Sequence, residues 1–143
     1  MTFRSLNLKF IYDNAEDNIF QDLINPLLSY SVSYKRGVGY FSSSWLEICA
    51  EGLLNMAEDD GKILLVTSPH LSEQDWDAFR LGNEARKNEI VFQSLSNQVE
   101  KMKNDMSDSK LLLLAWLIAD GLLEVKIAIP RNRRGDFHDK FAI

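Results

Sequence analysis

The histidine and lysine near the C-terminus, His138 and Lys140, are the residues of this sequence best suited to chemistry. They stand two positions apart in the segment FHDKFAI, whose aromatic and β-branched residues are typical of a strand. If residues 136–143 form a strand, side chains alternate between its faces and these two point the same way. An imidazole can attack phosphorus, and a neighbouring ammonium group can hold phosphate oxygens. The pair therefore predicts phosphoryl transfer.

Positive charge gathers around this pair although the whole chain is acidic. The sequence has 16 basic and 21 acidic residues, a net charge of −5, which argues against a nucleic-acid binder that uses its whole surface. From Lys126 to Lys140, however, there are five basic residues and only two acidic ones. Arginine forms bidentate contacts with phosphate, so we expect this stretch to hold a phosphate backbone. A solvated hairpin turn is the alternative interpretation of its three arginines, Arg131, Arg133 and Arg134.

Two other positions have weaker claims to a functional role. Ser42 opens a run of three serines before an expected helix, and the free N–H groups of a helix N-terminus can bind phosphate. Simple N-capping by Ser44 is the favoured alternative. His70 follows an expected strand at the edge where open α/β sheets bind ligands, but a local hydrogen-bonding role is the favoured interpretation. With two separated histidines and one cysteine, no metal-site spacing exists, and we expect no metal or cofactor.

Strand-like and helix-like segments alternate along the chain and must position these residues. The order predicts a layered α/β/α fold with a mixed sheet, in which the last two strands form a hairpin. We expect KILLVT to be buried on both faces, and Cys49 and the three tryptophans to belong to the packing. The expected strands are 3–11, 32–41, 62–67, 124–129 and 136–143. The first expected helix runs from Asn14 or Asp17 to Ser29, and the second from a capping box at Ser44 and Glu47 to the Asp59-Asp60-Gly61 turn. A third helical stretch covers residues 73–103, with a break at Gly82 and Asn83. The last expected helix covers residues 109–120 and ends at Gly121.

Composition places the chain among ordinary globular domains of a reducing compartment. The chain has 143 residues, 45% of them hydrophobic, and its one cysteine rules out an internal disulfide framework. The N-terminus lacks the apolar run of a signal peptide, and the longest apolar stretch, Leu111 to Ala119, is too short to span a bilayer. We expect a cytoplasmic protein with no membrane partner.

The chain has a family resemblance in two segments, GVGYFSSSWLEICAEGL and EVKIAIPRNRRGDFHDKFAI. Together they resemble the phospholipase D superfamily, and in particular the phospholipase-D-like nuclease modules of bacterial restriction and helicase-linked proteins. The family signature is His-x-Lys followed four residues later by Asp, and the resemblance covers most of residues 32–143. It implies that His138 attacks phosphorus to give a phosphohistidine, that Lys140 holds the phosphate oxygens, and that no metal is required.

The sequence departs from the family pattern in two respects. The family Asp would fall two positions after Ile143, and the family uses two His-x-Lys motifs, one for the nucleophile and one for the general acid. The other histidine here, His70, has no lysine two residues on. We therefore expect residues 1–143 to be the N-terminal portion of a single phospholipase-D-like domain, inactive by itself. The second motif would come from C-terminal sequence or from a second subunit, for which a homodimer is natural.

The resulting expectation is a DNA phosphodiesterase that acts in bacterial restriction or phage defence and is linked to a helicase. DNA is favoured over a phospholipid because no segment shows a membrane-binding amphipathic face, and because the arginine turn suits a polyanion. Two alternatives stay open. One is a non-catalytic module that binds nucleic acid or assembles with a partner, and the other is a phospholipid phosphodiesterase on the same scaffold.

Overall fold

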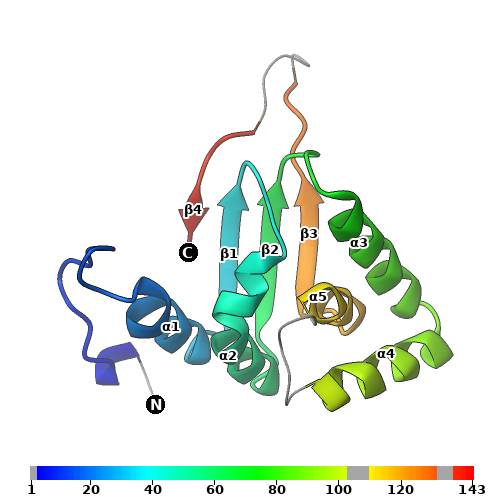
Figure 1. Ribbon diagram of the computed structural model, residues 1–143, viewed down its shortest axis with the longest axis horizontal. Helices are drawn as coiled ribbons and strands as arrows, with labels where there is room; N and C mark the ends of the chain where they lie inside the picture. Colours follow the sequence, from blue (N-terminus) through cyan, green and yellow to red (C-terminus); the bar gives the residue numbers. More distant parts are fainter. Residues whose placement is uncertain (1–2, 103–109, 132–136) are drawn as a thin grey trace.

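In the described part of the chain, the fold is mixed α/β, with five α-helices beside a four-stranded sheet (Figure 1). The structure is a computed structural model that describes residues 3–102, 110–131 and 137–143. A 3-10 turn (Phe3–Ser5) and a π-helical segment (Phe20–Ile24) come before the regular elements. Those elements are α1 (Asn25–Ser29), β1 (Ser33–Val38), α2 (Ser44–Glu58), β2 (Lys62–Thr67), α3 (Glu73–Ala85), α4 (Glu89–Met102), α5 (Lys110–Ala119), β3 (Leu123–Ile127) and β4 (Phe141–Ala142).

The sheet has the order β3-β2-β1-β4, with the first three strands parallel and β4 antiparallel to β1. The expected mixed sheet is thus confirmed, but the expected hairpin of the last two strands is wrong. β4 pairs with the free edge of β1 instead of with β3. The backbones of Lys35 and Ile143 exchange two hydrogen bonds, of 2.8 and 2.9 Å. Gly37 allows this approach, because a Cβ at that position would overlap the ring of Phe141.

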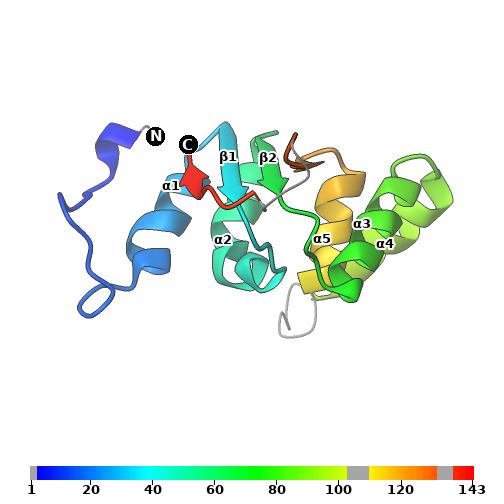
Figure 2. The same ribbon diagram turned by 90° about the horizontal axis from the view of Figure 1, so that it is seen from above.

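The helices lie on one side of the sheet, which gives two layers where three were expected (Figure 2). The core fills the space between them, and Ile63, Leu65 and Leu123 point into it from the strands. On the other face of β2, Leu64 and Val66 are only half-buried, so the expectation that this strand is buried on both faces is wrong. The residues completely or almost completely shielded from solvent are Leu28, Leu46, Cys49, Leu53, Met56, Leu65, Thr67, Ser68, Leu114, Leu117 and Leu123.

The N-terminal segment differs most from expectation. The expected strand over residues 3–11 is wrong, because Phe3–Ser5 is a 3-10 turn, residues 6–13 form no strand, and Phe10 is fully exposed. The free edge of β1, where such a strand would add, is occupied by β4. The following helix begins at Phe20, later than Asn14 or Asp17. The side chain of Asp17 accepts a hydrogen bond of 2.9 Å from the backbone N–H of Asp13, a local alternative to helix that aspartate often provides.

Most helix boundaries follow the local sequence signals. The Asp59-Asp60-Gly61 turn ends α2, with Asp60 in the left-handed region at φ 54°, and Gly121 ends α5 at φ 81°. The hydroxyl of Ser72 caps α3 by accepting a hydrogen bond of 3.1 Å from the N–H of Asp75. The Asp59-Asp60-Gly61 turn and Gly121 are entirely local signals, which explains why the sequence predicts where these two helices end.

Two expected boundary features are wrong. The capping box at Ser44 is not formed, because Ser43 occupies the N-cap position of α2 and its side chain makes no cap hydrogen bond. The break in the long polar segment comes after Ala85 and not at Gly82. Gly82 instead packs α3 against α5, since a Cβ there would lie 2.6 Å from the carbonyl oxygen of Ala115. In the parts of the chain that the structure describes, no helix combines the length and the apolar character needed to cross a bilayer.

Candidate active site

The two histidines of the chain lie at the edge of the sheet where the parallel strands end. The segment after β1 contains Gly39 and Tyr40, the segment after β2 contains His70, and residues 137–140 lead into β4 beside them. Carboxyl ends of parallel strands meet at one edge of a sheet, where ligands commonly bind. Both histidines contact the ring of Tyr40. The ring centroids are 6.2 Å apart for Tyr40 and His70, and 6.1 Å apart for Tyr40 and His138.

His138 is exposed and is held by the backbone of Gly39. A Cβ on Gly39 would lie 2.7 Å from the carbonyl oxygen of Phe137 and 3.2 Å from Cα of His138. Only a glycine admits this approach. The same position would lie 3.5 Å from Nδ1 of His138, so the Nδ1 side of the imidazole faces Gly39.

A buried serine connects the segments after β1 and β2. The hydroxyl of Ser68, which is completely shielded from solvent, donates a hydrogen bond to the carbonyl oxygen of Gly39. The same oxygen atom of Ser68 accepts a hydrogen bond of 3.3 Å from the backbone N–H of His70. One side chain thus fixes the residue before Tyr40 and the residue His70 itself.

Lys140 is exposed and lies outside the strand that was expected to carry it. β4 contains only Phe141 and Ala142, so the expectation of a strand over residues 136–143 is wrong for His138 and Lys140. Their shared direction no longer follows from strand alternation. Among the described residues, Lys140 forms no hydrogen bond or ion pair, whereas His138 contacts Tyr40. The ammonium group of Lys140 is therefore available to an anion.

The arginine turn falls partly outside the described residues. Arg131 is exposed just after the end of β3, consistent with either a phosphate contact or a solvated turn. Arg133 and Arg134 lie outside the described residues, so their phosphate contacts stay predictions.

Ser42 is exposed and stabilises the start of α2. Its hydroxyl oxygen accepts a hydrogen bond of 3.3 Å from the backbone N–H of Ser44. Lys110 approaches the same helix end, 3.4 Å from the hydroxyl of Ser44 and 3.4 Å from the carboxylate of Glu47. The first turn of α2 therefore already has polar neighbours, and a phosphate contact by Ser42 stays a prediction.

Arg36 and Cys49 belong to the packing between β1 and α2. The guanidinium group of Arg36 lies 5.0 Å from the centre of the Trp45 ring, and Tyr34 stacks on the same ring at 6.0 Å. Cys49 is fully buried, as expected, and burial raises the pKa of its thiol from 9.0 to about 11. Such a thiol is a poor nucleophile, because the thiolate is the reactive form.

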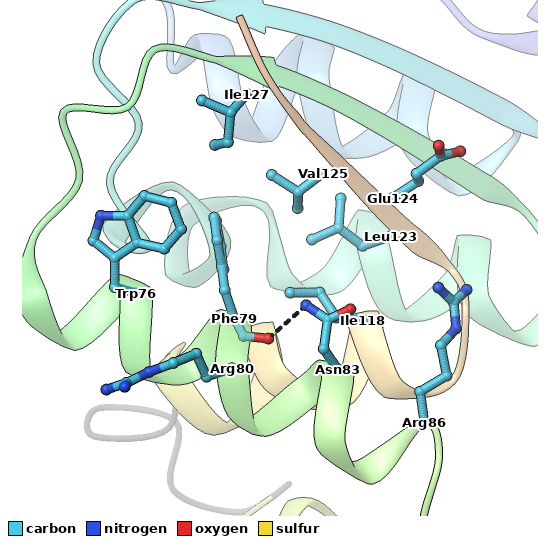
Figure 3. Close-up of a pocket in the computed structure, with 10 residues that line it drawn as sticks. All are labelled: Trp76, Phe79, Arg80, Asn83, Arg86, Ile118, Leu123, Glu124, Val125 and Ile127. Atoms are coloured by element: carbon cyan, nitrogen blue, oxygen red, sulfur yellow. Dashed lines mark hydrogen bonds between the residues drawn. The ribbon is translucent and has the colours of Figure 1, made fainter.

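Two hollows elsewhere are formed by other elements. One, of about 260 Å³, lies between α3 and the free edge of β3, with Phe79 and Val125 in its wall and Arg80 and Arg86 beside it (Figure 3). A larger one, of about 700 Å³, lies between α2, α4 and α5 at the opposite ends of the strands. The segments that carry His70 and His138 contribute to neither lining.

Comparisons with known proteins identify no relative: no protein-family model, no curated protein and no solved structure matches the chain. The case for a function therefore rests on the site itself. Sequence reasoning did not predict that His70 and His138 contact the same ring, that of Tyr40. The available signal was the position of His70 after the carboxyl end of β2, together with that of Tyr40 after the neighbouring strand β1.

Proposed function

We propose that this chain supplies the nucleophile of a phosphodiesterase domain that cleaves DNA through a phosphohistidine intermediate. The observation that carries the proposal is the position of His138, an exposed imidazole beside Gly39 at the edge of the sheet where the parallel strands end. The nitrogen Nε2 attacks phosphorus, and the P–O bond to the leaving group breaks. Lys140 binds the non-bridging oxygens, whose negative charge increases in the transition state. A second histidine protonates the leaving oxygen, and water then releases the phosphohistidine.

The phospholipase-D-like assignment is part of this proposal. The support for it is the His-x-Lys spacing on a mixed α/β scaffold, together with the segment from Gly37 to Leu53 that resembles the nuclease modules. DNA is the proposed substrate because Arg131, Arg133 and Arg134 give the acidic chain a local surplus of positive charge. A role in restriction or phage defence, alongside a helicase, follows from the same resemblance.

The test is cleavage of DNA by the full-length protein in the presence of EDTA. The proposal predicts that His138→Ala reduces the rate by at least 10³-fold, the scale expected for loss of a nucleophile. Lys140→Ala is expected to weaken transition-state binding by about 2–4 kcal/mol, comparable to loss of an oxyanion donor. Activity that survives His138→Ala unchanged would show that another group attacks phosphorus. DNA binding without cleavage by the wild-type protein would favour the non-catalytic module instead, and cleavage of phosphatidylcholine vesicles but not DNA would favour the lipid enzyme.

A further inference from the structure

We propose that two copies of this chain exchange residues 5–12, each segment adding as a strand to the free edge of β3 in the other copy. The exchange uses neither His138 nor Lys140 and is therefore separate from the proposed function. The interface that it forms lies at the edge of the sheet opposite to β4.

The backbone of β3 offers an unpaired edge. Among the described strands, β3 stands at the end of the sheet and pairs with β2 alone. The carbonyl of Leu122 and the N–H of Ala128 both bond to β2, at 2.7 Å. Backbone groups of alternate residues point the other way, so those of Leu123, Val125 and Ile127 face the free edge. Such an edge is a template for a further strand.

The hollow beside this edge has space for the side chains of an added strand. Helix α3 lies beyond β3 on this side of the sheet, where a further strand would cover it (Figure 1). Phe79, Val125 and Ile127 line the hollow of about 260 Å³ between them (Figure 3). The ring of Trp76, in the same lining, is still 38% exposed. Side chains of an added strand that point toward the helices would therefore enter an apolar space.

Residues 5–12, SLNLKFIY, have the sequence of a strand but form none in the described chain. Leu6, Leu8 and Phe10 alternate with polar residues, which gives a strand one apolar and one polar face. In their own chain these residues lie on the α1 side of the sheet, far from β3, and Phe10 is fully exposed (Figure 1). The apolar face is thus left uncovered in one copy, and the hollow beside β3 of a second copy fits it.

The area buried by a reciprocal exchange reaches what a stable dimer needs. Each copy would contribute its own segment and the ten residues that line the hollow beside β3. Interfaces bury roughly 35 Å² per contributing residue, so two exchanged segments would bury about 1,200 Å² in total, the lower end of the range for stable complexes. Reciprocal exchange also closes the assembly at two copies.

Phe10 and Ile11 provide a matched pair of variants. Both are exposed in the free chain, but they would lie on opposite faces of the added strand. Phe10→Thr removes a side chain from the hollow, Ile11→Thr alters the polar face, and threonine keeps the strand propensity in both. Analytical ultracentrifugation of the protein measures the dimer Kd. We expect a wild-type dimer, a Kd raised about 10²-fold or more by Phe10→Thr, and a change of less than about fivefold for Ile11→Thr.

Amide hydrogen exchange identifies the surface that pairs. The N–H groups of Val125 and Ile127 gain partners in the exchanged dimer, so they should exchange at least about tenfold more slowly in wild type than in Phe10→Thr. The N–H of Leu65, in the inner strand β2, reports any difference in overall stability.

Each other outcome would overturn the exchange. A monomeric wild-type protein, or a dimer that both variants weaken equally or not at all, would show that the apolar face of residues 5–12 forms no interface. Protection of the β3 edge that Phe10→Thr leaves unchanged would show that another segment covers it. Protection that depends on Phe10 in a monomer would show that the segment folds back onto its own chain.

Discussion

The hydroxyl of Ser68 donates a hydrogen bond to the carbonyl oxygen of Gly39 and thereby joins the segments that follow β2 and β1. This contact is made by two buried residues, yet each is followed within two positions by an exposed aromatic side chain of the candidate site, His70 and Tyr40. A contact of the interior therefore sets the positions of groups on the surface.

Ser68→Ala is expected to affect both stability and activity. The substitution leaves the buried carbonyl of Gly39 without its donor, and we expect it to lower the free energy of unfolding by about 1–3 kcal/mol. Chemical denaturation measures this loss. DNA cleavage should fall about tenfold or more at temperatures where the variant is folded, because a displacement of about 1 Å at a site can be that costly. A folded variant with wild-type activity would show that Ser68 does not position the site.

Gly39→Ala tests whether the backbone approach of residues 137 and 138 holds the nucleophile. The added Cβ would lie 2.7 Å from the Phe137 carbonyl oxygen, so this segment must move away from β1. We expect a loss of DNA cleavage of about 10²-fold, on the scale of a displaced catalytic group. The thermal midpoint, measured in parallel, should drop by only a few degrees, because the displaced segment is exposed. An active variant would mean that Gly39 does not hold His138 in place.

The sequence predicts the elements better than it predicts the site. β2 matches its expected bounds, and the helix around Cys49 and the one ending at Gly121 follow from apolar periodicity and local stop signals. The pairing of β4 with β1 is different, because it depends on a close contact between Gly37 and Phe141 across more than 100 positions. The contacts of His70 and His138 with the ring of Tyr40 also join residues far apart in the sequence, and no periodic pattern of residues predicts them.

Asn25 is a buried polar group whose removal should be costly. Its amide nitrogen donates to the carbonyl of Ile48 at 3.1 Å, and its amide oxygen accepts from the N–H of Gly52 at 3.2 Å. The side chain thus ties α1 to α2, and it is only 3% exposed. We expect Asn25→Ala to lower the free energy of unfolding by about 2–4 kcal/mol, for two lost hydrogen bonds and a small cavity. Asn55→Ala is a matched control, because its amide contacts Ser29 across the same helices at an exposed position.

A stability loss for Asn25→Ala no larger than that of Asn55→Ala would contradict the bridging role. Urea unfolding monitored by tryptophan fluorescence measures both variants, since Trp45 lies in the same helix α2.

Cys49 should be chemically inert in the folded protein and should make stability depend on alkaline pH. Burial raises the pKa of its thiol from 9.0 to about 11, so the folded state keeps a proton that the unfolded state loses first. This contribution to stability is fully present below pH 9 and is lost as the pH rises through 11. Urea midpoints between pH 8 and 11 should therefore fall more steeply for wild type than for Cys49→Ala. Parallel curves, or modification of the native thiol by DTNB at pH 8 without unfolding, would contradict the burial argument.

The most direct measurement is capture of the covalent intermediate. The protein is mixed with DNA labelled with ³²P at the scissile phosphate, in EDTA, and quenched in alkali, in which phosphohistidine is stable. Peptide mapping is predicted to place the label on His138, with no labelled protein from His138→Ala. Efficient cleavage with no labelled protein, or label on a residue other than His138, would contradict the account.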